Sequence, residues 1–159
     1  MKKLDYIILS IILVIAFSLR LYKIDQPLAD SYSYKQVAVA SVGKHFATGN
    51  FNLLQPQTND LSNIPSGQDN PQGYYFAEFP LYNAIFGFLY KYLPITSLEI
   101  YARLTTILLT LPVISIIYYF GLKEHSRIAG ITSATLYAVL PFFVYFSRLV
   151  LAENLIISC

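Results

Sequence analysis

Six ionisable residues lie at the edges of strongly apolar segments, where a charged side chain is costly unless it has a partner or a function. Three are acidic and three are basic: Asp30, Glu78 and Glu153, and Lys35, Arg103 and Arg148. Carboxylates act as general bases or hold divalent cations, whereas arginine and lysine bind phosphate groups. A site that combined these side chains could therefore carry out chemistry on a phosphate.

Each of these side chains also has a local structural explanation. Asp30 precedes a predicted helix, and from the local sequence alone its favoured role is to cap that helix. Glu78 lies at the start of a predicted short helix, where a negative charge complements the helix dipole. Arg103 and Arg148 can extend their charged ends to the membrane surface, or Arg148 can form a surface pair with Glu153.

The composition is that of a membrane protein. Of its 159 residues, 55% are hydrophobic and 13% are charged, against about 25% charged residues in a soluble domain. The mean hydropathy is +0.51. A single cysteine excludes a disulfide framework or a cysteine-based zinc site. The small, scattered net charge of +2 argues against nucleic-acid binding.

Three segments are predicted to cross the membrane, which takes about 20 apolar residues in a helix. They cover residues 1–24, 101–122 and 128–146, and the prolines at 112 and 141 are expected to be tolerated as kinks. The first segment could instead be a signal peptide, but no small-residue cleavage site follows it. Residues 79–93 are too short to cross and are interpreted as an amphipathic or re-entrant helix.

The positions of the basic residues predict how these helices are oriented in the membrane. Lys2 and Lys3 place the N-terminus in the cytoplasm, and the hinge over 123–127 carries the second basic cluster. Three crossings put both clusters inside, whereas a fourth crossing by residues 79–93 would put the hinge outside. The sequence therefore predicts an all-α polytopic membrane protein in which the six candidate residues, together with Arg20, lie on the external side.

The predicted external loop covers residues 25–100. Within it, apolar and polar residues alternate at helical spacing over about 31–48, which favours a surface helix that ends at Gly49-Asn50. The stretch that follows is rich in Pro, Asn, Gln, Ser and Gly and is predicted to be a connector. Residues 147–159 are expected to form a second external loop and the start of another helix. We expect an N-terminal portion of a larger protein, the alternative being a small protein with a frayed end.

Five motifs, in order along the chain, resemble segments of family 39-like glycosyltransferases. These belong to the GT-C superfamily, which includes protein O-mannosyltransferases and the lipid A aminoarabinose transferase. Two positions differ from the pattern: Ser31 replaces a glutamate found in many relatives, and Lys35 replaces an arginine. The motifs are Asp30-Ser-Tyr-Ser-Tyr-Lys-Gln36, Gly49-Asn-Phe-Asn-Leu-Leu-Gln-Pro56, Glu78-Phe-Pro-Leu-Tyr82, Tyr101-Ala-Arg-Leu104 and Ser147-Arg-Leu-Val-Leu-Ala-Glu153.

The resemblance implies a GT-C-type N-terminal bundle in the plasma or inner membrane, with amphipathic helices in its first external loop. The activity it implies is hexosyl or pentosyl transfer in protein or cell-envelope glycosylation. A sugar would pass from a polyprenyl phosphate to a hydroxyl of an acceptor protein, lipid or glycan, with inversion. As a portion of such an enzyme, the chain alone is expected to be inactive.

The resemblance also assigns roles to the six residues. Asp30 would be catalytic, and the bound lipid phosphate would contact the basic residues Lys35, Arg103 and Arg148. Glu78 and Glu153 would be secondary acidic residues, with Glu78 the candidate ligand of a divalent metal.

The alternative function is that of a non-catalytic polytopic membrane protein, such as a transporter fragment or an assembly subunit. Transporters place their ionisable groups near the bilayer midplane, whereas most of those in this chain are predicted at one face. That difference favours the enzyme. A degenerate relative without activity would have lost the catalytic acid, whereas Asp30 is present.

Overall fold

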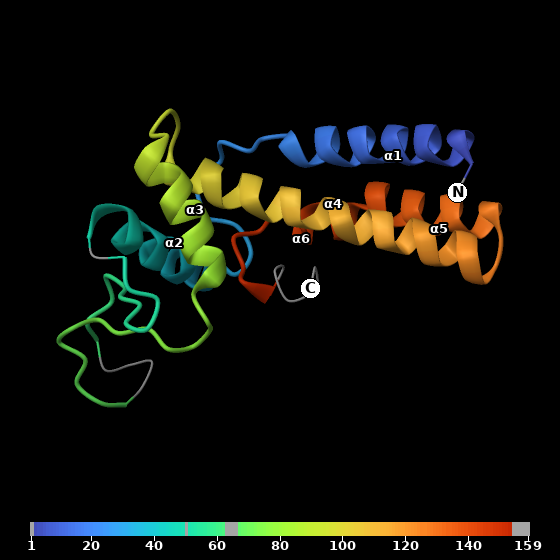
Figure 1. Cartoon of the computed structure of the whole chain (residues 1–159). Coiled ribbons are helices and arrows are strands. Elements are labelled where there is room, and N and C mark those ends of the chain that lie inside the picture. Colours follow the sequence, from blue (N-terminus) through green and yellow to red (C-terminus); the bar gives the residue numbers. More distant parts are fainter. Residues whose placement is uncertain (1, 50, 63–66, 154–159) are drawn as a thin grey trace. The chain divides into compact units, whose positions relative to one another are not determined.

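The computed structural model describes residues 2–49, 51–62 and 67–153. These residues form six α-helices and one isolated antiparallel bridge between Gln57 and Tyr74, so the fold is all-α (Figure 1). The predicted helix start beyond Glu153, and Asn50 at the predicted end of the surface helix, lie outside the described residues. The helices are α1 (Lys3–Leu21), α2 (Ser33–Thr48), α3 (Leu81–Tyr92), α4 (Leu98–Glu124), α5 (Arg127–Val139) and α6 (Pro141–Phe146).

The described residues form two compact units. The first unit contains residues 2–24 and 106–149, and the second contains residues 25–105 and 150–153. α1, α5 and α6 belong to the first unit and α2 and α3 to the second, while α4 contributes residues to both.

Among the helices of the described residues, two are long and apolar enough to cross a membrane. α1 has 19 residues and a mean hydropathy of 2.2, and α4 has 27 residues and a mean hydropathy of 1.9. On α1, large apolar side chains such as Ile7, Ile11 and Val14 are more than half exposed. Removing each from water is worth about 1.5–3 kcal/mol, so α1 is better suited to a lipid environment than to water.

The helix predicted over 128–146, with Pro141 as a tolerated kink, is instead divided into two helices at Leu140. α5 has only 13 residues and ends at Val139, and α6 begins at Pro141. Proline has no N–H to donate, and its ring forces the preceding residue out of the helical region. Leu140 accordingly has φ −59° and ψ 128°. Pro112, in contrast, lies inside α4 without ending it.

Arg20 of α1 satisfies carbonyl groups at this break. In a continuous helix the carbonyl of Tyr137 would accept a hydrogen bond from residue 141, which is a proline. Instead the Nη2 of Arg20 donates to the Tyr137 carbonyl at 3.3 Å and its Nη1 to that of Ala138 at 3.0 Å. Its Nε donates to the Oγ of Ser147 at 2.6 Å. The fully buried Arg20 side chain thereby joins α1 to the end of α5 and to the residue after α6.

Small residues allow the helices of the first unit to approach closely. α1, α5 and the later part of α4 lie side by side around a core that includes Ala16, Tyr118 and Ala134 (Figure 1). A Cβ on Gly121 would lie 2.6 Å from the Cα of Gly130, so larger residues would separate α4 from α5. Glycine and alanine at helix contacts are typical of helices that pack in membranes.

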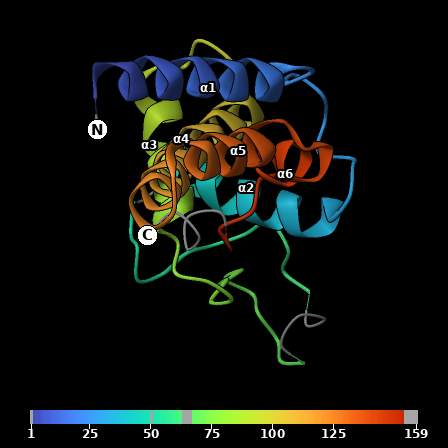
Figure 2. The ribbon, with the colours of Figure 1, turned by 90° about the vertical axis from the view of Figure 1, so that its right-hand side faces the viewer.

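In the second unit α2 and α3 pack against each other (Figures 1 and 2). A Cβ on Gly43 would overlap the ring of Phe86, so glycine is required where the two helices meet. Asn83 of α3 donates to the backbone carbonyl of Val39 in α2 at 2.7 Å. Part of the connection between α2 and α3 packs on α2, where the Oγ of Ser41 contacts Thr58 and Asn59.

Arg20→Met is expected to destabilise the protein by about 3 kcal/mol, because the buried carbonyl of Ala138 and the partly buried carbonyl of Tyr137 lose their donors at about 1–3 kcal/mol each. In a Pro141→Ala background, Arg20→Met should lower the free energy of unfolding by about half as much. The alanine supplies a backbone N–H that can donate to the Tyr137 carbonyl. Denaturant unfolding in mixed micelles measures all four free energies of this double-mutant cycle. Equal losses in both backgrounds would show that Arg20 does not compensate for Pro141.

Candidate functional site

The first turn of α2 brings together segments that are distant in the sequence. Its buried Gln36 donates through Nε2 to the Oδ1 of Asp30 at 2.6 Å and to the carbonyl of Ser31 at 2.8 Å. The Oε1 of Gln36 accepts a hydrogen bond from the backbone N–H of Val150 at 3.0 Å. Gln36 therefore holds the Asp30 turn and the segment that leads to Glu153. It was not among the predicted site residues, although it ends the Asp30 motif.

The neighbouring residue, Lys35, forms ion pairs with two of the predicted acidic residues. Its Nζ lies 2.9 Å from the Oε1 of Glu78 and also contacts the Oε1 of Glu153. The hydrogen bond with Glu153, and then that with Glu78, raises the pKa of Lys35 above its usual range. One ammonium thus serves two carboxylates, and this Lys35 cluster (Lys35, Glu78 and Glu153) has a formal charge of −1.

Two carboxylate oxygens in the Lys35 cluster retain accepting capacity. The Oε2 atoms of Glu78 and Glu153 are shielded from solvent and have no hydrogen-bond donor among the described residues. Buried polar atoms without partners are uncommon in native proteins. The cluster can therefore accept hydrogen bonds from hydroxyl or amine groups of a ligand.

The Lys35 cluster is less well suited to a divalent metal than to the hydroxyl or amine groups of a ligand. Calcium and magnesium take six or more oxygen ligands, and the described residues contain no group of three His, Cys, Asp or Glu side chains that could hold a metal. The ammonium of Lys35 already neutralises Glu78, the predicted metal ligand. No step is therefore assigned to a metal at this site.

Asp30 does not cap α2, contrary to the prediction from the local sequence. The N-cap is Tyr32, whose backbone lies in the left-handed region with φ 61° and ψ 28°. That conformation costs a non-glycine residue about 1–2 kcal/mol. The backbone of Asp30 accepts from the N–H of Ser33 at 3.1 Å, while its carboxylate binds Gln36. Glu78 lies before the N-cap of α3, whose first turn contains no acidic residue, and it forms an ion pair with Lys35.

The two predicted phosphate-binding arginines contact backbone carbonyls. Arg103, which is almost completely buried, donates through Nη1 to Gln26 and through Nη2 to Pro27 at 3.3 Å. Arg103 therefore fixes the turn that precedes Asp30. Arg148 belongs to the first unit, where it donates to the carbonyl of Tyr22 at 2.6 Å. Glu153, the surface partner suggested for Arg148, pairs with Lys35 instead.

An aromatic pocket of about 270 Å³ lies beside the Lys35 cluster. The ring of Tyr75 lines it and is close enough to Glu78 and Lys35 to respond to their charges. Burial, and then the negative charge of Glu78, raises the pKa of Tyr75. The pocket combines four aromatic rings with polar side chains; it is lined by Tyr34, Ala38, Thr58, Asp60, Asn70, Tyr74, Tyr75, Phe76 and Ala77.

Comparisons with known protein families, with curated proteins and with solved structures find no match to this chain.

Lys35→Met is expected to lower the free energy of unfolding by about 1 kcal/mol, a value kept small because solvent screens a partly exposed pair. Because its pKa is raised, Lys35 contributes this stability fully below the unfolded value of about 10.5 and loses it only as the pH rises through the folded value. The loss should therefore be constant between pH 7 and pH 10 in denaturant titrations.

Two variants control this measurement. Lys35→Arg keeps the positive charge and should retain most of the stability. Lys44→Met removes an exposed lysine of the same helix that forms no ion pair with a described residue, and it should cost less than Lys35→Met. Equal losses for Lys35→Met and Lys44→Met would contradict a stabilising role for the cluster.

Proposed function

We propose that the protein is a membrane glycosyltransferase of the GT-C type, similar to family 39, that uses a sugar linked to a polyprenyl phosphate. In this proposal α1, α4 and the segment formed by α5 and α6 cross the plasma or inner membrane, the N-terminus is cytoplasmic and the second unit lies outside. The five motifs support the family assignment. The exposed apolar surface of α1 supports insertion into a membrane.

One observation carries the proposal: α2 gathers acidic residues from three separate segments in its first turn. Asp30 precedes α2, Glu78 precedes α3 and Glu153 follows α6, yet their partners are the consecutive residues Lys35 and Gln36. A protein that needed only helix packing would have little reason to bury the polar Gln36 and to leave carboxylate oxygens without donors. Such an arrangement suits a ligand rich in hydroxyl groups.

In the proposed reaction, Asp30 acts as the general base. The Oδ1 of its carboxylate is held by Gln36, which leaves Oδ2 to take the proton of the acceptor hydroxyl. The hydroxyl oxygen then attacks the anomeric carbon of the sugar. The bond from that carbon to the phosphate oxygen breaks, and the lipid phosphate departs with the electron pair. Attack opposite the leaving group inverts the anomeric carbon.

The charges and the aromatic pocket have separate roles in this proposal. Lys35 has three N–H groups, of which two serve Glu78 and Glu153, so the third can bind an oxygen of the departing phosphate. The pocket beside Tyr75 would take the sugar ring, because aromatic faces and a few polar groups suit a ring that is apolar on its faces and polar at its edges. Arg103 acts indirectly, by fixing the turn before Asp30.

Asp30→Asn is expected to reduce sugar transfer about 100-fold to 10,000-fold, the usual contribution of a general base. The amide oxygen can still accept the hydrogen bond of Gln36, so the fold should be retained. The measurement follows transfer from labelled polyprenyl-phosphate sugars in membranes that contain the complete gene product, at matched expression.

Asp69→Asn is the matched control, since Asp69 is an exposed residue of the connector and should leave transfer unchanged. Full transfer by Asp30→Asn would move the base to Glu78 or Glu153, for which Glu78→Gln and Glu153→Gln are the next variants. If the wild-type protein transferred no sugar from any donor, the non-catalytic alternative would replace the proposed function.

A further inference from the structure

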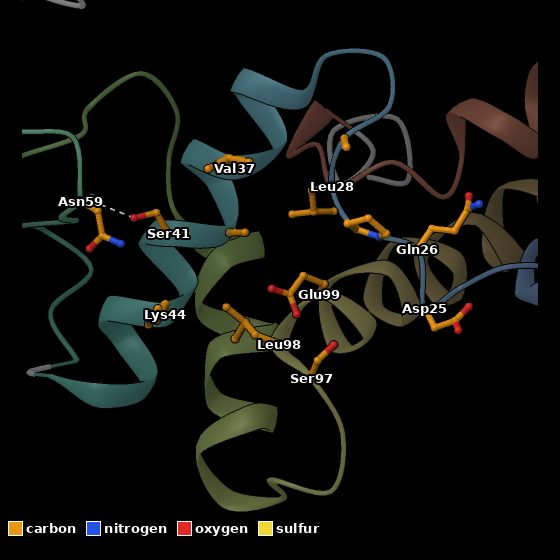
Figure 3. Close-up of a pocket in the computed structure, with 13 residues that line it drawn as sticks. Asp25, Gln26, Leu28, Val37, Ser41, Lys44, Asn59, Ser97, Leu98 and Glu99 are labelled. Atoms are coloured by element: carbon orange, nitrogen blue, oxygen red, sulfur yellow. Dashed lines mark hydrogen bonds between the residues drawn. The ribbon is translucent and has the colours of Figure 1, made fainter.

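A second pocket of the second unit has a different composition. It has a volume of about 540 Å³ and three walls: the turn over residues 25–29, one face of α2 and the start of α4 (Figure 3). The α2 wall consists of Val37, Ala40, Ser41 and Lys44, which follow the spacing of a single helix face. Ligand pockets commonly have volumes of about 300–1,000 Å³.

Two hydrogen-bond systems shape this pocket in advance of any ligand. The buried guanidinium of Arg103 binds the carbonyls of Gln26 and Pro27 and so fixes the first wall. On the α2 side, the Oγ of Ser41 accepts from the backbone N–H of Asn59 at 2.8 Å (Figure 3). A pocket with pre-formed walls loses less conformational entropy when a ligand binds.

The pocket contains charges of both signs. In Figure 3 Glu99 extends into the space between Leu28 and Lys44, and Asp25 lies at the edge of the first wall. Within the described part of the chain, none of these three charged residues forms an ion pair. A ligand that carried a cation and an anion a few ångströms apart could therefore pair with both kinds of charge.

The chain connections place this pocket at the membrane surface if α1 and α4 cross the membrane. α4 has 27 residues and is about 40 Å long, so it exceeds the roughly 30 Å hydrocarbon core and its first turn lies in the headgroup layer. Glu99 belongs to that first turn. Asp25 follows the end of α1 by four residues, a span of at most about 14 Å.

We propose that this pocket binds the headgroup of a zwitterionic aminoethyl phospholipid, such as phosphatidylethanolamine. Lys44 pairs with the phosphate, Glu99 and Asp25 accept hydrogen bonds from the ammonium group, and Leu28, Val37 and Leu98 contact the glycerol and upper acyl carbons. An anionic lipid such as phosphatidylglycerol is disfavoured because it meets two carboxylates and brings no cation. The site is separate from the Lys35 cluster and needs membrane insertion but no glycosyl transfer.

Native mass spectrometry of the full chain tests the proposal. The protein is released from detergent with equimolar phosphatidylethanolamine and phosphatidylglycerol, and the retained lipids are counted. We expect the wild-type protein to favour phosphatidylethanolamine about 10-fold, which corresponds to about 1.4 kcal/mol. Glu99→Gln should remove most of this preference, whereas Lys44→Gln should lower the retention of both lipids, because both carry the phosphate.

Glu124→Gln and Lys123→Gln are matched controls at the opposite end of α4, where the two exposed side chains pair with each other. They should leave the preference unchanged. Equal retention of the two lipids by the wild-type protein overturns the proposal, and so does a preference lost equally in Glu99→Gln and Glu124→Gln. Displacement of the lipid by an equal concentration of free phosphoethanolamine would overturn the lipid assignment in favour of a soluble ligand.

Discussion

The first unit depends on how the backbone carbonyls at the Pro141 break are satisfied. In an apolar environment no water is present to donate a hydrogen bond to an unpaired carbonyl. A helix can therefore be interrupted only where another group of the protein supplies that hydrogen bond. Arg20 is that group, and its guanidinium has enough donors to serve Tyr137, Ala138 and Ser147 together. Its charge is delocalised and it is shared among oxygen atoms, which lowers the cost of burying it. This one side chain links α1 to the end of α5 and to the residue after α6.

In the second unit, too, side chains of one helix hold segments that are distant in the sequence, but the result is a candidate site. Consecutive side chains on a helix diverge, so Lys35 and Gln36 can serve two sets of partners from one turn. The ion pairs of Lys35 are partly open to solvent, whereas the side chain of Gln36 is buried. The hydrogen bonds of Gln36 fix the backbone turn at Asp30 and Ser31. The ion pairs of Lys35 hold charged groups that solvent can partly reach. Rigid support beneath an accessible charged group is the arrangement that a binding site requires.

Much of the fold was predictable because hydrophobic spacing and proline are local signals. Helices occur where the sequence predicts them, within residues 1–24 and near residues 31–48, 79–93 and 101–122. The break at Leu140 was missed because prolines can be accommodated in membrane helices, as Pro112 is, and the partner that decides the outcome at Pro141 lies more than a hundred residues away. The capping role predicted for Asp30 failed for a similar reason: the sequence does not reveal that Gln36 competes for the carboxylate.

The candidate residues were chosen by their charge, which can be read directly from the sequence. The partners of these residues could not be predicted, because no local pattern pairs Lys35 with both Glu78 and Glu153. The predicted phosphate ligands illustrate the limit most clearly. An arginine in an apolar segment can bind a ligand or a backbone carbonyl, and Arg103 and Arg148 both have carbonyl partners that only the folded chain supplies.

The long sequence separation within the Arg20 contacts has a consequence for biosynthesis. Tyr137 follows Arg20 by 117 residues, and at about 5–20 residues per second a ribosome needs roughly 6–23 s to make that stretch. During this interval α1 has been synthesised, but the α5 carbonyls that Arg20 binds in the folded protein have not. Because Arg20 is one residue from the end of α1, its long side chain can remain in the interfacial water until α5 arrives. The contacts that join Arg20 to α5 therefore form late in the assembly of this protein.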